Sequence, residues 1–149
     1  YSLLQVTPGK DMIFNPKGSL LFTGNTGPYL QYMCARISSM MRKAVEQGID
    51  PGVPVRFDVL TADVEWQLVR LIERFPDVVA QAGTEYSPAG IATYVYDLAK
   101  TFSAYYHDHP ILAADDPEVR DARLVLAKSI LQTLRNGMDL LNIPVLEVM

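Results

Sequence analysis

Apolar residues recur at three- and four-residue intervals along most of the chain, which predicts helices rather than strands. No stretch alternates convincingly between apolar and polar residues, and no internal repeat or low-complexity segment is present. The expected helices run from about Thr26 to Gln47, from about Thr61 to Phe75, from about Ser87 to His107 and from about Asp116 to Leu141. The pattern therefore predicts an all-α fold, a bundle of four main helices.

Prolines and small polar residues indicate where these helices begin and end. We expect Thr26, Ser87 and Asp116 to cap their helices, because a proline follows each of them at a first-turn position. Pro76 is expected to end the second helix, so that residues 77–83 form only a further short helical turn. In the same way, Pro144 is expected to end the last helix and to leave a tail after it. This tail is rich in apolar residues, so we expect it to dock on the bundle, with Leu146 as its anchor in the core.

The first 18 residues contain two prolines and two glycines, which is typical of a connector rather than of a helix. We therefore expect a connector over residues 1–18 and one helical domain over residues 19–149. Because the chain begins at Tyr1 rather than at a methionine, we also expect it to be an excised piece of a longer protein.

The apolar face of each helix predicts the core. The third helix contributes a stripe that ends in Tyr106, with Tyr105 at its margin. Arg123 falls on the core face of the last helix, where a guanidinium needs a carboxylate or several carbonyl oxygens as partners. Cys34 lies on the apolar face of the first helix and is expected to be a small core residue. A single cysteine excludes an internal disulfide and fits the reducing cytoplasm.

The net charge of −4 argues against binding to duplex nucleic acid through bulk positive charge. Recognition of unpaired bases remains possible, because stacking requires only a few aromatic and cationic side chains. No apolar run approaches the length of a membrane span, so no membrane partner is expected.

A polar and aromatic stripe lies beside the apolar face of the first helix. Its members are Tyr29, Tyr32, Arg36, Ser39 and Lys43, which share about one quarter of the helix circumference. One interpretation is structural: the tyrosines lie at the margin of the core and Arg36 pairs with an acid. The other is functional: the stripe is a stacking surface with an adjacent guanidinium for an unpaired base and its phosphate. Periodicity alone leaves both interpretations open.

The sequence contains no pattern typical of an active site. There is no nucleophile motif and no glycine-rich phosphate loop, and the lone cysteine is expected to be buried. His107 and His109 lie on different sides of a helix end without a matched third ligand, which favours a polar helix cap over a metal site. No catalytic residue, metal or cofactor is therefore expected in this chain.

Four segments together resemble one known family. They are "FTGNTGPYLQYMCARISSMMRK", "FPDVV", "YVYDLAKTFSAYYHDHPIL" and "ARLVLAKSILQTLRNGMDLLNIPVLEVM", in this order. They are similar to the C-terminal helical anticodon-binding domain of arginyl-tRNA synthetases, the type named for an Asp-Ala-Leu-Arg motif. The resemblance covers nearly the whole chain from about Asp11, although the naming tetrapeptide itself is absent.

The resemblance implies a parent enzyme that joins arginine to its tRNA with ATP and magnesium, on a separate catalytic domain. The two signature motifs of that domain are missing here, so the chain alone is expected to be inactive. By the same resemblance, the tRNA-binding residues are Tyr29, Tyr32, Arg36, Tyr106 and Met149, which meet the anticodon loop and chiefly its middle cytosine. The expected partners are that loop and the catalytic domain, within a monomeric parent. The alternative is a helical protein-interaction module that binds no RNA.

Overall fold

The computed structural model describes residues 1–149 and contains helices but no strands. The helices of ten or more residues are α2 (Gly27–Glu46), α3 (Asp63–Glu73), α4 (Phe75–Thr84), α5 (Ala89–Asp108) and α6 (Pro117–Leu140). A short helix α1 (Pro16–Ser19) and the 3-10 turns η1 (Ser2–Gln5) and η2 (Phe57–Val59) complete the secondary structure. The predicted all-α class is confirmed, but the main helices number five rather than four.

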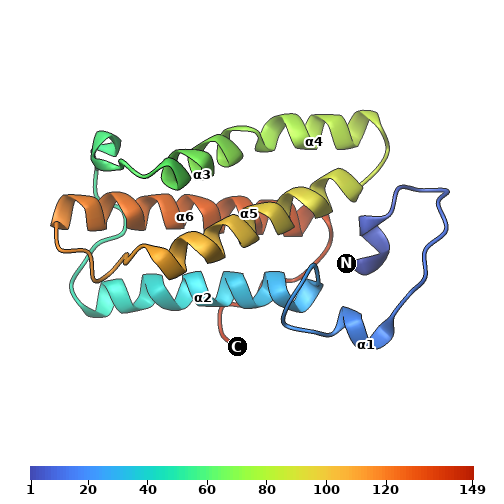
Figure 1. The fold of residues 1–149 in the computed structure, drawn as a ribbon, viewed down its shortest axis with the longest axis horizontal. Coiled ribbons are helices and arrows are strands. Elements are labelled where there is room, and N and C mark those ends of the chain that lie inside the picture. The colour runs from blue at the N-terminus through green and yellow to red at the C-terminus, as the bar shows by residue number, and fades with distance from the viewer.

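The helices form two layers (Figure 1). In one layer, α2, α5 and α6 pack against one another along the long axis of the molecule. In the other layer, α3 lies on α5 and α6, and α4 lies on α5. The N-terminal turn η1 also packs on α5, where the Tyr1 hydroxyl donates to the Ala92 carbonyl oxygen at 2.9 Å. None of these helices combines the length and the apolar character that a membrane span requires.

The fifth helix arises at Pro76, where the sequence-based prediction was wrong. The α3 helix ends at Glu73, and Arg74 serves both as its C-cap and as the N-cap of α4. Pro76 then occupies the first turn of α4, a position where the backbone N–H that proline lacks has no intrahelical partner. The proline therefore begins a helix instead of only ending one, and residues 77–83 form the body of α4.

The predicted caps are correct at two of three positions. The Thr26 side chain accepts from the Tyr29 N–H, and the Asp116 side chain accepts from the Glu118 N–H. Ser87 does not cap α5, whose N-cap is Pro88 without a side-chain hydrogen bond. The last helix ends at Leu140, before Pro144, because the chain turns through Asn142 in the left-handed conformation at φ +54°.

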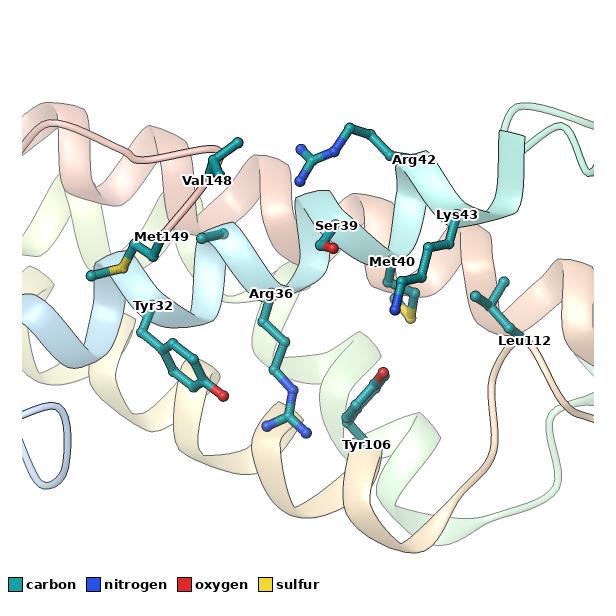
Figure 2. Close-up of a pocket in the computed structure, with 11 residues that line it drawn as sticks. Tyr32, Arg36, Ser39, Met40, Arg42, Lys43, Tyr106, Leu112, Val148 and Met149 are labelled. Atoms are coloured by element: carbon teal, nitrogen blue, oxygen red, sulfur yellow. The ribbon is translucent and has the colours of Figure 1, made fainter. Parts of the chain in front are cut away.

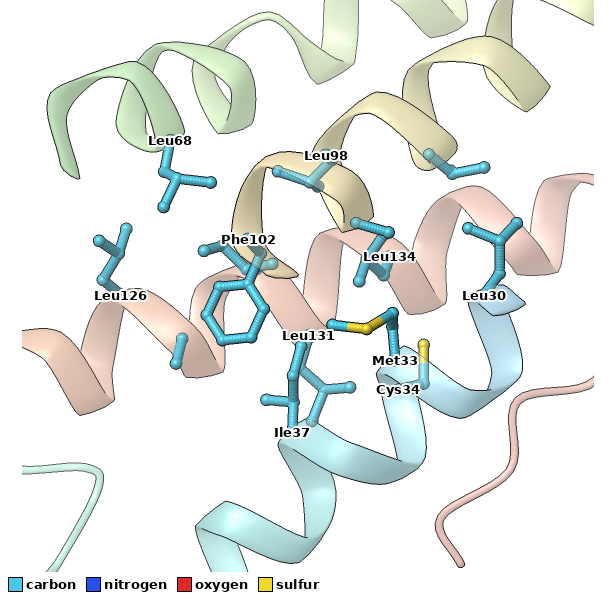
Figure 3. Close-up of a cluster of buried hydrophobic side chains, with 14 of the residues drawn as sticks. Leu30, Met33, Cys34, Ile37, Leu68, Leu98, Phe102, Leu126, Leu131 and Leu134 are labelled. Carbon is cyan, nitrogen blue, oxygen red and sulfur yellow. The ribbon is translucent and has the colours of Figure 1, made fainter. Parts of the chain in front are cut away.

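One cluster of 27 buried residues forms the core and joins both layers. Figure 3 shows Leu30, Met33 and Ile37 of α2 directed toward α6, while Leu68 of α3 belongs to the other layer of the same cluster. Cys34 is fully buried among them, and burial raises the pKa of its thiol to about 12. The prediction that Cys34 is a core residue is therefore confirmed, and its thiol stays protonated near neutral pH.

The α5 and α6 helices approach closely at Gly137. A methyl group on Gly137 would overlap the Cγ1 atom of Val95 and would lie 3.5 Å from the Phe75 ring. Val95 is fully buried and β-branched, so its side chain has little freedom to move aside. The absence of a side chain at Gly137 thus permits the packing of these two helices.

We predict that Gly137→Ala lowers the free energy of unfolding by about 1–3 kcal/mol, the usual cost of overpacking a core. The matched control is Gly83→Ala, near the end of α4, where an added methyl group meets nothing within 4 Å. Urea denaturation of both variants checks the prediction. The close approach would not constrain the fold if the two substitutions had the same effect.

Candidate functional site

An open pocket of about 430 Å³ lies between α2, the end of α5 and the C-terminal tail. Three elements that are far apart in the sequence thus form its walls (Figure 2). The residues that line it are Tyr32, Ala35, Arg36, Ser39, Met40, Arg42, Lys43, Tyr106, Leu112, Val148 and Met149. Tyr32, Arg36, Tyr106 and Met149, four of the five expected site residues, therefore lie around one pocket.

The closest contact across the pocket joins Arg36 and Tyr106. The Arg36 guanidinium carbon lies 4.5 Å from the centre of the Tyr106 ring, within the range of a cation–π interaction. Tyr32 is one helical turn before Arg36 on the same face of α2, and its side chain is 40% exposed (Figure 2). The pocket therefore presents one accessible aromatic ring next to a stacked arginine and a second ring.

The pocket also gathers positive charge in an acidic protein. Arg36, Arg42 and Lys43 line it, although the whole chain has a net charge of −4. The arginines in the four ion pairs of the structure are Arg56, Arg120, Arg123 and Arg135, so no carboxylate neutralises the three pocket cations. Unpaired cations around a concave surface attract an anion such as a phosphate.

Tyr29 is separate from this pocket. It lies on α2 and packs at the edge of the core, with its ring centre 5.9 Å from that of Tyr96 on α5. Partial burial raises the pKa of its hydroxyl above the ordinary value for tyrosine. The structural interpretation of the stripe thus describes the position of Tyr29, whose contact with RNA stays a prediction.

The C-terminal tail covers one side of the pocket. Met149 and Val148 line it, and Figure 2 shows Met149 beside Tyr32. Sequence reasoning also assigned Leu146 as the apolar anchor of this tail, which is wrong: its side chain is 37% exposed. Ile143 and Val145 pack against the core instead.

Tyr105 and Tyr106 have exchanged the places that periodicity predicted. Tyr105 is 1% exposed and belongs to the core, whereas Tyr106 is half-buried and lines the pocket. The reason is a polar partner inside the protein: the Tyr105 hydroxyl donates to the buried Glu65 carboxylate at 3.0 Å. A helical wheel gives the angular position and the hydrophobicity of each residue, and it contains no information about a hydrogen-bond partner on another helix.

Comparison with known proteins decides the family. A model of the DALR anticodon binding domain matches residues 30–149. The chain belongs to the DALR anticodon-binding domain family. It is 46% identical to the arginine–tRNA ligase of Treponema denticola over 153 residues, which cover all of this chain and 26% of that protein. The Parabacteroides distasonis arginine–tRNA ligase is 45% identical, with all of this chain and 25% of that protein covered.

Solved structures agree with this assignment. The arginyl-tRNA synthetase of Thermus thermophilus superposes with a TM-score of 0.88 at 34% identity, over 99% of this chain and 25% of that one. The Plasmodium falciparum arginyl-tRNA synthetase gives a TM-score of 0.78 at 26% identity, over 98% of this chain and 25% of that one. This DALR domain thus spans about a quarter of the length of its relatives and matches their C-terminal part.

A network of hydrogen bonds around the buried Glu65 carboxylate lies next to the end of α5 that forms one wall of the pocket. The Arg123 Nε atom donates to Glu65 at 2.8 Å, and its NH1 atom donates to the Pro110 carbonyl oxygen at 2.8 Å. The expectation that Arg123 finds a carboxylate or carbonyl oxygens is therefore correct on both counts. Pro110 begins the loop that carries Leu112 to the pocket, and the Tyr105 in this network precedes Tyr106. The network thereby connects the core of the DALR domain to one wall of its pocket.

The two histidines lie at this same end of α5. His109 is the C-cap residue, and its ring stacks on Tyr105 with 4.9 Å between centres. His107 is exposed one position before the end of the helix. No three His, Cys, Asp or Glu side chains gather closely enough to hold a metal ion.

We predict that Arg123→Met lowers the free energy of unfolding by about 3 kcal/mol, because it leaves the Glu65 carboxylate buried without its cation. The control is Arg56→Met, which breaks an exposed ion pair with Asp58 and should leave stability almost unchanged. Urea denaturation measures both variants. Equal stability of the Arg123 variant and the wild-type chain would contradict the role given to this network.

Proposed function

We propose that this domain binds the anticodon loop of arginine tRNA and contacts chiefly the middle base, a cytosine. The observation that carries the proposal is the pocket, which combines the rings of Tyr32 and Tyr106 with three unpaired cations. The family membership of the chain and its similarity to arginine–tRNA ligases support an RNA ligand over a partner peptide. A protein-interaction module without RNA binding is therefore the less favoured alternative.

The chemistry of the pocket suits an unpaired nucleotide. Bases that leave the helical stack are recognised by stacking on aromatic side chains and on the plane of an arginine. Tyr32 offers an exposed ring for this purpose, and Arg36 can contact a base or a phosphate beside it. Lys43 and Arg42 then meet the negatively charged backbone of the loop. Met149 supplies a flexible apolar contact for a base edge.

We further propose that the parent protein is an arginine–tRNA ligase that uses ATP and Mg²⁺ on a catalytic domain outside this chain. On this proposal the chain alone neither activates arginine nor charges tRNA, and the parent is monomeric and cytoplasmic. Residues 1–18 would connect the two domains. Exposed apolar side chains in the N-terminal region, among them Ile13, Phe14 and Phe22, support contact with a neighbouring domain there.

The direct test is binding of the 149-residue chain to an anticodon stem-loop of arginine tRNA. A second stem-loop carries a substitution at the middle anticodon base and is otherwise identical. We expect measurable binding of the first and at least tenfold weaker binding of the second, about 1.4 kcal/mol. Equal binding of both RNAs would remove sequence recognition from the proposal, and absence of binding would overturn it.

We predict that Arg36→Ala weakens stem-loop binding by roughly 1–3 kcal/mol, the range for a lost charge-assisted contact or a lost stacked base. Thermal stability should change little, because Arg36 lies off the buried face of α2 and has no ion-pair partner. Arg70→Ala on the exposed surface of α3 is the matched control for the loss of one positive charge. Normal affinity together with early melting would assign Arg36 a structural role.

We also predict that removal of Val148 and Met149 weakens stem-loop binding without loss of the fold. Both side chains are more than half exposed, so little core packing is lost with them. In the proposed parent enzyme, the same truncation should raise KM for tRNA and leave the ATP–pyrophosphate exchange that reports arginine activation unchanged. Wild-type affinity in the truncated chain would exclude the tail from the binding site.

A further inference from the structure

The C-terminal tail follows a sharp turn at the end of α6. The Ile143 N–H donates to the Met138 carbonyl oxygen at 2.9 Å, and Asn142 between them has a positive φ. This helix-ending motif fixes the direction in which the tail leaves α6. From there the tail crosses to α2 and reaches the pocket with Val148 and Met149.

Three side-chain donors meet the tail along this path. Gln31 of α2 donates to the Pro144 carbonyl oxygen at 2.9 Å. Further along α2, Arg42 donates to the Glu147 carbonyl oxygen at 3.1 Å. Arg135 of α6 donates to the Glu147 side chain at 2.9 Å, so Glu147 is held from two helices at once.

Burial contributes little at the end of the tail. The side chains of Val148 and Met149 are 72% and 57% exposed, and Leu146 lies outside the core cluster. Free ends of chains fray unless specific contacts hold them. The wall of the pocket that contains Met149 therefore depends on polar contacts two residues earlier, at Glu147.

We propose that Glu147 and Arg135 form a latch that positions Met149 for RNA binding, although neither lines the pocket itself. The proposal rests on the proposed function, because it assigns positioning residues to the same site. An ion pair as exposed as this one, with Arg135 at 34% and Glu147 at 69%, is weak. The latch thus opens and closes readily, and the apparent affinity for RNA scales with the fraction of chains in which it is closed.

Glu147→Gln separates this latch from a general effect of charge. Loss of a negative charge near the pocket strengthens the attraction of a polyanion, so long-range electrostatics predicts tighter RNA binding. Loss of the ion pair frees the tail, so the latch predicts weaker binding. The two explanations differ in sign. The substitution also leaves intact the backbone carbonyl that Arg42 contacts.

The experiment measures stem-loop affinity and amide hydrogen exchange over residues 144–149 in the 149-residue chain. The matched control is Asp58→Asn, which also removes one negative charge from an exposed ion pair, with Arg56, and does not line the pocket. For Glu147→Gln we expect two- to fivefold weaker binding and faster exchange in the tail. For Asp58→Asn we expect wild-type exchange in the tail and affinity equal to or above that of the wild type.

A charge exchange between the two positions provides the second variant. Arg135→Glu alone should release the tail, and its combination with Glu147→Arg should restore slow exchange there. Tighter or unchanged RNA binding by Glu147→Gln, or unchanged exchange in the tail, would overturn the latch while the proposed function stands. If the wild-type chain binds no stem-loop, the proposed function is wrong, and exchange in the tail alone then supports or overturns the latch.

Discussion

The burial of one face of α2 against α5 and α6 determines where the α2 side chains of the pocket lie relative to Tyr106. Met33, Ile37 and Met40 are almost fully buried on that face, which fixes the rotation of the helix about its axis. Since successive helical residues are about 100° apart, the same rotation places Arg36 and Ser39 at the edge of the contact. Arg36 is thereby directed toward Tyr106 of α5, the helix that packs beside α2. The side of the pocket formed by α2 and α5 is thus a consequence of how the core is packed.

The distribution of charge favours binding of an anionic ligand in this pocket. The chain is acidic overall, and four arginines outside the pocket pair with carboxylates, among them Arg123, which pairs with Glu65 inside the protein. The pocket cations have no such partner, so their field is available to a ligand. An acidic surface elsewhere disfavours indiscriminate binding of polyanions. Local positive charge within a negative protein therefore suits selective contact with a short unpaired segment rather than with a long duplex.

Sequence alone predicted the parts of this structure that depend on local periodicity. The all-α class, the extents of α2 and α6 and the caps at Thr26 and Asp116 follow from residue spacing and cap chemistry. The same reasoning failed to predict α4, because a proline is compatible with two positions, after the end of one helix or in the first turn of the next. Pro76 can end a helix or occupy its first turn, and only the path of the chain through Arg74 decides between these roles.

Failures in the site have a different origin, namely contacts between distant segments. Tyr105 and Tyr106 are adjacent residues of the same type. The carboxylate that accepts a hydrogen bond from the buried Tyr105 hydroxyl belongs to Glu65, 40 positions earlier in the chain. Leu146 was expected to anchor the tail because it is apolar. The hydrogen bonds that hold the tail come instead from side-chain donors on α2 and α6. Periodicity cannot predict either outcome, because it measures the face of one helix and not what lies opposite.

The two sides of the pocket consequently differ in how firmly they are held. The side that carries Arg36 and Tyr106 is continuous with the core, so moving it would require repacking of α2 and α5. The side that carries Met149 rests on exposed polar contacts and can move without disturbing the core. A nucleotide that entered the pocket would therefore meet a fixed stacking surface and an adjustable apolar cover. Such an arrangement places the rigid groups where orientation matters and leaves the flexible methionine to adapt to the base.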